Sequence, residues 1–191
     1  MHKITKIYLD MDGVIADFNK RYKELYKIEP KEADTYKTFD KFFTMFIAER
    51  QFATLNLMPD AIELINYLRS LKVPTEILSS TSSEKRDAEI REQKIEWLNN
   101  QNIGFPVNLV PGKRFKRDFS NSNSLLIDDT PQNIDQWRVE GGIGILHTDA
   151  ITTIGILKMY TWHWINITIL WEVCGQVVFN TPFIHRLYER K

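Results

Sequence analysis

The chain has 191 residues, 43% apolar and 26% charged, as expected for a soluble globular protein with one sizeable core. Lysine plus arginine equals aspartate plus glutamate at 25 each, which excludes an overall basic bias toward nucleic acid. The single Cys174 excludes an internal disulfide and agrees with a reducing, cytoplasmic compartment, and the lack of a long apolar run before residue 10 predicts no secretory signal.

The most informative stretch is residues 7–18, which read IYLDMDGVIADF. Its first three residues predict a short buried strand, and Asp10, Asp12 and Gly13 follow where that strand ends. Two carboxylates separated by one residue, on the loop leaving a strand, can hold a hard cation through oxygen atoms. They can also divide the nucleophile and acid roles of a reaction between them.

This string resembles the first motif of the haloacid-dehalogenase (HAD) superfamily of phosphatases, and it is most similar to the 5′(3′)-deoxyribonucleotidase branch with its small bacterial and viral members. The resemblance implies that Asp10 attacks a phosphate to form an aspartyl phosphate. Asp12 would protonate the leaving oxygen and then activate water. In that branch the residue matching Phe18 packs on the nucleobase; a hinge-packing role is the alternative reading of Phe18.

Residues 19–56 change to a charged and aromatic pattern with helical spacing. HAD enzymes often carry a helical cap at this place, so the resemblance implies a cap that closes over the site and excludes water. We expect most aromatic side chains of this insert to form its own small core.

A helix is predicted over residues 60–71, with Asp60 as its N-cap, and a strand over residues 73–78. Hydroxyl side chains follow at residues 79–83. Their position fits the second HAD motif, in which one hydroxyl binds a phosphate oxygen. The register favours Ser79, then Ser80, while Thr81 is expected to form a capping box with Glu84.

The next helix is predicted over residues 83–100, with Ile90, Ile95 and Leu98 facing inward. Lys94 shares that face. It is interpreted either as a boundary residue that snorkels to solvent or, from the resemblance, as a substrate-binding lysine that points back toward the site.

A basic segment, PGKRFKRDFS, follows a strand predicted at residues 107–110. Phosphoryl transfer needs a fixed cation, which the third HAD motif supplies as a lysine. The family pattern of a lysine four residues before a small residue fits Lys116 and Ser120, and Lys113 is the alternative. A solvated basic loop or a nucleic-acid contact is the reading without catalysis.

The segment SLLIDDT at residues 124–130 predicts a buried strand that ends in two adjacent acids. Without a cation, Asp128 and Asp129 would repel each other, and this repulsion argues for a metal. The resemblance to the fourth HAD motif implies a magnesium site with Asp10 and the backbone carbonyl of Asp12. We favour Asp129 as the direct ligand and Asp128 behind it, since oxygen ligands near phosphate suit Mg²⁺ better than zinc.

The resemblance continues through a short helix and a strand at residues 143–146, after which His147 is a minor candidate for a catalytic base. The uncharged run at residues 159–171 is too short to span a membrane and is interrupted by polar residues. We therefore expect it to pack against the domain or a partner.

These signals predict an α/β fold with a doubly wound parallel sheet. Residues 1–18 and 57–158 would form the catalytic core, 19–56 the cap and 159–191 a tail of unknown role. The expected activity is Mg²⁺-dependent hydrolysis of a nucleoside monophosphate, in particular a deoxyribonucleotide, with no stable nucleic-acid or membrane partner; a homo-oligomer is compatible with the sequence. Another small phosphate ester, such as a sugar phosphate or phosphoglycolate, a polynucleotide 3′-end, and an inactive binding module are the alternatives.

Overall fold

The computed structural model of the chain describes residues 3–32 and 36–160. The chain divides into two compact units, Met1–Ile156 and Leu157–Lys191, and the account below concerns the first. Residues 161–191, which hold most of the predicted tail and Cys174, lie outside the described residues. Among the residues described, no helix is both long and apolar enough to cross a bilayer.

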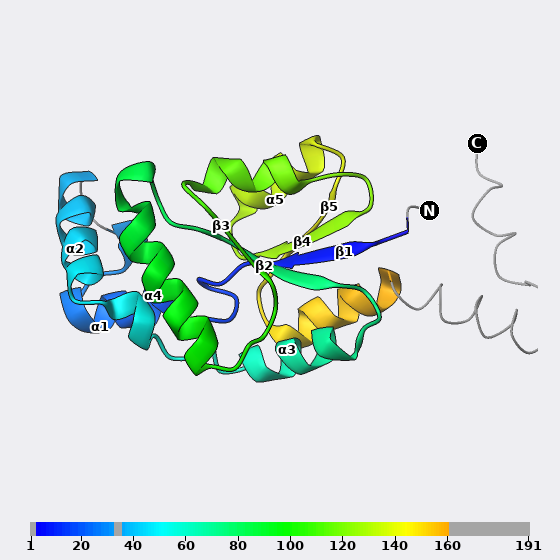
Figure 1. The fold of residues 1–191 in the computed structure, drawn as a ribbon, viewed down its shortest axis with the longest axis horizontal. Helices are drawn as coiled ribbons and strands as arrows, with labels where there is room; N and C mark the ends of the chain where they lie inside the picture. The colour runs from blue at the N-terminus through cyan, green and yellow to red at the C-terminus, as the bar shows by residue number, and fades with distance from the viewer. Residues whose placement is uncertain (1–2, 33–35, 161–191) are drawn as a thin grey trace, which may run out of the picture. The chain divides into compact units, whose positions relative to one another are not determined.

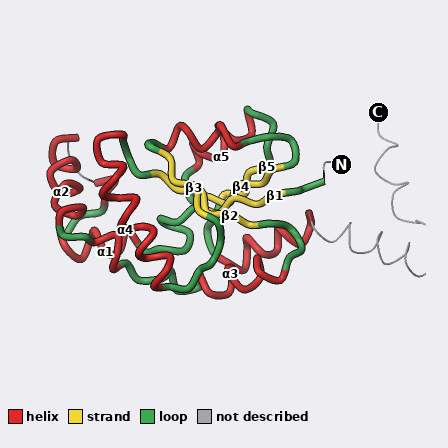
Figure 2. The backbone as a smooth tube through the Cα atoms, in the orientation of Figure 1, coloured by secondary structure: helices red, strands yellow, loops and turns green. Residues whose placement is uncertain are grey.

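Five parallel strands form one sheet in the order β3-β2-β1-β4-β5 (Figure 2). They are β1 (Lys6–Leu9), β2 (Thr75–Ser80), β3 (Val107–Val110), β4 (Ser124–Asp128) and β5 (Ile143–Leu146). The order reverses direction on either side of β1, and all five carboxyl ends meet at one edge. The predicted doubly wound α/β fold is therefore confirmed.

Helices cover both faces of the sheet, which is why its central strands are buried throughout. They are α3 (Ala61–Ser70), α4 (Asp87–Asn100), α5 (Pro131–Val139) and a last helix at residues 150–160. Figure 1 shows α5 on one side of the sheet, with α3 and the last helix on the other. The core on the α5 side is built by Tyr8, Leu78, Val110, Leu126, Ile134 and Trp137.

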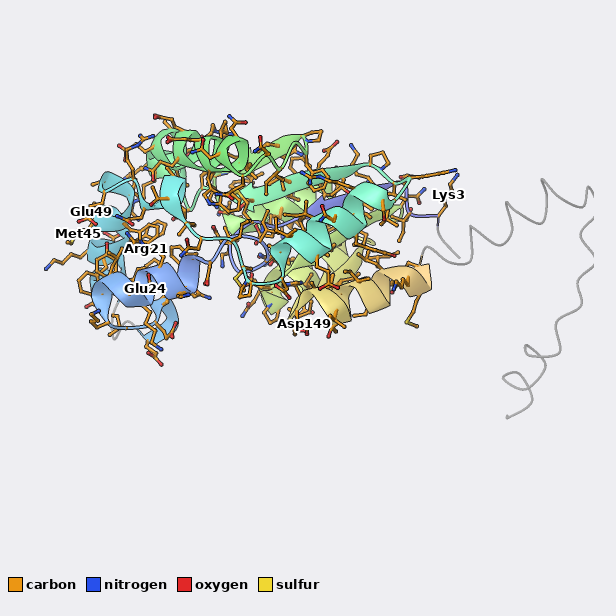
Figure 3. All side chains as sticks on the ribbon, turned by 90° about the horizontal axis from the view of Figure 1, so that it is seen from below. Lys3, Arg21, Glu24, Met45, Glu49 and Asp149 are labelled. Carbon is orange, nitrogen blue, oxygen red and sulfur yellow. The ribbon has the colours of Figure 1, made fainter. Side chains whose placement is uncertain are left out.

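The segment between β1 and α3, called the insert below, holds α1 (Phe18–Tyr26), η1 (Pro30–Glu32), α2 (Tyr36–Ala48) and η2 (Gln51–Thr54). Aromatic rings fill its interior: Phe46 lies 5.1 Å from Phe18 and 5.0 Å from Phe52, between ring centroids. The labelled side chains of the insert, Glu24 and Met45 among them, lie at the opposite end of the first unit from Lys3 (Figure 3). Lys3 precedes β1, so the insert lies toward the carboxyl edge of the sheet.

Helix α4 joins the insert to the sheet, and its inward face differs from the prediction at Ile95. Ile90 and Leu98 are buried, as predicted. Ile95 is 40% exposed, whereas Gln93, Lys94 and Trp97 are buried. The Gln93 amide donates to the Ile47 carbonyl at 2.9 Å and accepts from the Phe52 N–H at 3.2 Å. Polar contacts as well as apolar packing therefore determine which face of α4 is buried.

Two local predictions near the helix ends also need correction. Asp60 occupies the N-cap position of α3 but makes no cap bond there. Its carboxylate instead accepts from the Ala150 N–H at 2.6 Å, at the start of the last helix. Strand β2 extends through Ser80, so the first two hydroxyls of the predicted loop belong to the end of the strand.

We expect Trp97→Ala to lower the free energy of unfolding by about 3–5 kcal/mol, because it empties a fully buried site. It also removes the indole N–H that donates to the Leu55 carbonyl at 2.7 Å. Ile95→Ala on the same helix is the control and should cost less than about 1 kcal/mol. Urea unfolding of both variants measures the difference, and equal losses would contradict the observed orientation of α4.

Candidate active site

The register of the sheet brings two predicted acidic groups together. Strands β1 and β4 are neighbours, with Leu9 opposite Ile127, so Asp10 and Asp128 emerge side by side. The Asp10 N–H donates to the Ile127 carbonyl at 3.0 Å, which fixes the first residue beyond β1 against the sheet. Asp10 and Asp128 are both buried, with exposed fractions of 6% and 0%.

Lys116 lies between these two carboxylates. It comes from η4 (Lys113–Phe119), which follows β3, and its side chain is 2% exposed. Its Nζ is 2.8 Å from Asp10 Oδ2 and 2.6 Å from Asp128 Oδ2. Of the two predicted candidates, Lys116 is thus the lysine at the acid pair. Lys113 lies at the margin, 3.4 Å from the Thr130 hydroxyl.

The charged side chains of this group shift one another's pKa. Burial opposes the charged form of Asp10, but Lys116 and Lys94 outweigh it and lower the pKa of the Asp10 carboxyl. Burial and the negative charge of Asp10 raise the pKa of Asp128 despite Lys116. Burial alone would lower the pKa of Lys116, but the two carboxylates raise it. The lysine therefore stays protonated, and Asp10 stays an anion, as a nucleophile must.

The two acids after β4 have different surroundings. Asp128 accepts hydrogen bonds from the Asn133 amide at 2.9 Å and from the Thr130 N–H at 2.8 Å, besides Lys116. Asp129 lies against Gly13, whose φ is +79° and where a Cβ atom would come within 2.2 Å of Asp129 Oδ2. Burial, with the negative charges of Asp10 and Asp128, raises the pKa of Asp129 to about 7.

Asp10, Asp128 and Asp129 can each offer an oxygen atom, and these atoms lie within 4.8 Å of one another. A set of carboxylate oxygens suits a hard divalent cation. The oxygens of Asp128 are already engaged, while Asp129 has no charged hydrogen-bond donor among the described residues. The donor set thus fits a cation held by Asp10 and Asp129, with Asp128 positioned behind them.

Lys94 joins the loop after β1 to the end of β2. Its fully buried Nζ donates to Asp12 Oδ2 at 2.6 Å, to Ser79 Oγ at 2.9 Å and to the Ser80 carbonyl at 2.9 Å. It does not snorkel, and it is absent from the lining of the cavity described below. Asp12 Oδ1 is buried and has no hydrogen-bond partner among the described residues, so this oxygen is left for a reacting group.

The three candidate hydroxyls are not equivalent. Ser79 is 1% exposed, and its oxygen accepts from Lys94, which leaves its own hydrogen for a phosphate oxygen. Ser80 Oγ accepts from the Ser82 N–H. Thr81 Oγ1 donates to the Asp87 carboxylate, so the predicted capping box with Glu84 is wrong. The geometry favours Ser79, then Ser80.

A cavity of about 470 Å³ opens above these groups. Its lining combines two sets of residues, called the charged end and the aromatic end below. The charged end comes from the sheet edge and the loops around it and holds Asp10, Asp12, Ser79, Lys116 and Asp129; the aromatic end comes from the insert and holds the rings of Phe18, Phe39, Phe43 and Phe52. Phe18 contacts the cavity and also stacks on Phe52, with their rings 5.7 Å apart and 6° from parallel. It serves the packing of the insert whether or not it also contacts a ligand.

One candidate residue does not lie at the cavity, and several residues of the site were not predicted. His147 does not line the cavity; its ring bonds the Thr153 hydroxyl at 2.8 Å, and burial lowers its pKa. Asn133, which holds Asp128, was not predicted, although an amide in the first turn after an acid pair is a usable signal. Phe52 and Asn19 also line the cavity and were missed, because nothing in their local sequence marks them.

The site combines acids after β1 and β4, hydroxyls at the end of β2 and a buried lysine between the acids. Together these groups define a hydrolase of the HAD superfamily. A sequence model of the family described as "5' nucleotidase, deoxy (Pyrimidine), cytosolic type C protein" matches residues 3–171. The chain belongs to this family and is a phosphoric monoester hydrolase, as the resemblance predicted.

The chain is also similar to solved structures, and the first of the two below agrees on the fold. A hydrolase from Streptococcus pneumoniae TIGR4 matches with a TM-score of 0.53 at 15% identity, over 82% of this chain and 99% of that one. A haloacid dehalogenase-like hydrolase from Bacteroides fragilis matches with a TM-score of 0.49 at 15% identity, over 74% and 86% of the two chains. No curated protein sequence matches the chain.

Lys116→Met should destabilise the protein by about 3 kcal/mol, because it leaves two buried carboxylates without their cation. Adding Asp128→Asn to this variant should restore part of the loss, since it removes one of the two like charges. Thermal and urea unfolding of the single and double variants measure this coupling. A single variant as stable as the original protein would show that the group is not held by these charges.

A divalent cation should raise the midpoint of thermal unfolding, by an amount equivalent to about 2.7 kcal/mol at 100 times its dissociation constant. Asp129→Asn should remove most of this increase. Asp118→Asn is the matched control, because Asp118 is 61% exposed on η4 and lies outside the acid group. The test is thermal unfolding with MgCl₂, CaCl₂ or EDTA; equal responses of both variants would contradict the assigned ligands.

Proposed function

We propose that the chain hydrolyses nucleoside monophosphates, with deoxyribonucleotides preferred, and that Mg²⁺ is its cation. The observation that supports this is the two-ended cavity, with ionised groups at one end and phenylalanine rings at the other. A substrate that fills both ends has a phosphate joined to a flat, weakly polar group, as a nucleotide does. The family description, which names pyrimidine deoxynucleotides and the cytosol, favours the same substrate and a cytoplasmic location.

In the proposed reaction the phosphate lies between Asp10, Ser79 and Lys116. An Asp10 carboxylate oxygen attacks phosphorus as the ester P–O bond breaks, which leaves an aspartyl phosphate. Asp12 gives its proton to the departing ester oxygen and later takes one from the water that attacks the phosphoryl group. Inorganic phosphate leaves, and the Asp10 carboxylate is regenerated. The proton would be carried on Asp12 Oδ1, the oxygen without a partner among the described residues, while Lys94 holds Oδ2 at 2.6 Å.

Lys116 would offset the charge that develops on the transferring oxygens, and Ser79 would donate a hydrogen bond to one of them. When bound, Mg²⁺ would neutralise further phosphate charge and orient the phosphoryl group, held by Asp10, Asp129 and the backbone carbonyl of Asp12. Lys94, first considered for substrate binding, is better placed to hold Asp12 and Ser79 in position. Asp128 would keep Lys116 and the acid group in place through Asn133.

We also propose that the insert, residues 19–56, acts as the cap and that Phe18 stacks on the base. The rings of the insert would cover the nucleoside and keep water away from the aspartyl phosphate. A nucleotide at the end of a polynucleotide would meet the insert, so chain ends should be poor substrates.

The test is phosphate release from ribo- and deoxyribonucleoside 5′- and 3′-monophosphates, sugar phosphates and a 3′-phosphorylated oligonucleotide, with Mg²⁺ and with EDTA. We expect Mg²⁺-dependent release concentrated on deoxyribonucleotides. Asp10→Asn should lower kcat by about 10³-fold or more without changing the fold, because it removes the nucleophile. Asp118→Asn on the exposed surface is the control.

Release confined to sugar phosphates would keep Asp10 as nucleophile and remove the role given to Phe18. Release from no compound, by folded protein, would favour the inactive binding module. Unchanged hydrolysis by Asp10→Asn would show that the mechanism is wrong.

A further inference from the structure

A second hollow adjoins the active-site cavity. It is an open groove of about 570 Å³ between the loops that follow β2 and β3. Ser82 and Lys113 line both the groove and the cavity, so the two spaces meet at these residues. The mechanism above uses no residue that lines the groove alone.

The groove is basic, and within the described residues its cations form no ion pairs. Lys85, Lys113 and Arg114 line it, against the single acid Glu84. Within the described residues, none of the three cations forms an ion pair with an acid. The arginines nearby behave differently: Arg86 pairs with Asp40 at 2.7 Å, and Arg91 pairs with Asp87 at 3.0 Å. Three positive charges gathered against one negative charge favour an anionic ligand.

The groove also has polar groups at its junction with the cavity. Ser82 has a φ of +73°, a conformation that is uncommon for a residue with a side chain and is often found at binding sites. Its N–H bonds Ser80 Oγ at 3.0 Å, which fixes this part of the loop next to the candidate phosphate-binding hydroxyls. On the other wall, the Arg114 guanidinium lies over the Phe115 ring, 4.7 Å from its centroid, and this contact restricts where the charge can lie.

We propose that this groove binds a second phosphate group of the substrate, so that the enzyme prefers nucleoside 3′,5′-bisphosphates to the monophosphates. The inference rests on the proposed function. Because Ser82 and Lys113 line both spaces, a substrate with its reacting phosphate at Asp10 and its base beneath the insert would reach the groove past these two residues. A phosphate on the other sugar hydroxyl enters the groove and meets Lys85 and Arg114. Glu84 reduces the positive charge of the groove without cancelling it.

The experiment compares thymidine 5′-monophosphate, thymidine 3′-monophosphate and thymidine 3′,5′-bisphosphate as ligands and as substrates. Affinity is measured by calorimetry on the full chain with Asp10→Asn, which prevents turnover. The kcat/KM of the active protein is measured by separating the products, so that each lost phosphate is identified. The test variant is Lys85→Gln with Arg114→Gln. The control is Lys72→Gln with Arg117→Gln, which removes the same charge at exposed positions outside both spaces.

We expect the bisphosphate to bind about fivefold or more tightly than either monophosphate, because its second phosphate would pair with the partly exposed Lys85 and Arg114. The preference should weaken as the salt concentration rises. The test variant should lose most of this preference and keep its activity on the monophosphates, whereas the control should retain it. Equal affinity for all three ligands, or a preference that survives in the test variant, would overturn the proposal while the monophosphatase function stands. If no thymidine nucleotide binds or is hydrolysed, the proposed function fails, and this inference fails with it.

Discussion

The contact on which the rest of the site depends is the buried lysine between two carboxylates. Lys116, Asp10 and Asp128 are almost fully removed from water, and any one of these charges alone would be costly there. They are tolerable together because the Lys116 ammonium group lies 2.8 Å from the Asp10 carboxylate and 2.6 Å from the Asp128 carboxylate. The group still carries an excess of negative charge once Asp129 is counted. Burial, together with this excess, raises the pKa of Asp129 to about 7, and the excess is also why the same arrangement fits a divalent cation. The stability of the fold and the proposed chemistry thus depend on the same feature of these residues. That feature is the balance of charge at the carboxyl edge of the sheet.

Helix α4 connects this charged group to the insert. Lys94 and Gln93 are adjacent in sequence, yet Lys94 holds the loop after β1 and the end of β2, while Gln93 holds the backbone of the insert. Trp97, one turn further along, fixes the segment by which the chain returns from the insert to the core. A change in the position of α4 would therefore move the Asp12 contact and the aromatic end of the cavity together. One helix therefore contacts both the acid group and the aromatic insert.

The sequence predicted the core better than its connections. Strands β1, β3, β4 and β5 could be located because short apolar runs end abruptly in acids, glycines or turn residues. Asp10, Asp12, Ser79, Lys116, Asp128 and Asp129 could be assigned to one edge from the order of these strands. The inward face of α4 was predicted in part: Ile90 and Leu98 are buried as expected, but Ile95 is not, and the buried Gln93 has partners only in the folded chain. The same reason explains Asp60 and Thr81: their carboxylate and hydroxyl were expected to cap the nearest helix, and both instead bond groups brought close by the fold. Local patterns do not reveal which of several polar partners a side chain takes.

The two ends of the cavity differ in how strongly the fold determines them. The charged end rests on strand register: a shift of one residue between β1 and β4 would separate Asp10 from Asp128 and leave Lys116 with only one partner. The aromatic end depends on ring packing within the insert. There, a phenylalanine can be replaced by another apolar side chain of similar volume with only a modest change in the free energy of folding. In the proposed function, the reaction class therefore depends on the part of the molecule that tolerates least change, and the choice of substrate on the part that tolerates more. The basic groove belongs to the second kind, because Lys85 and Arg114 are exposed and have no ion-pair partner within the described residues. Removing their charges should leave the fold and the acid group intact, and so substrate preference can change here independently of the chemistry.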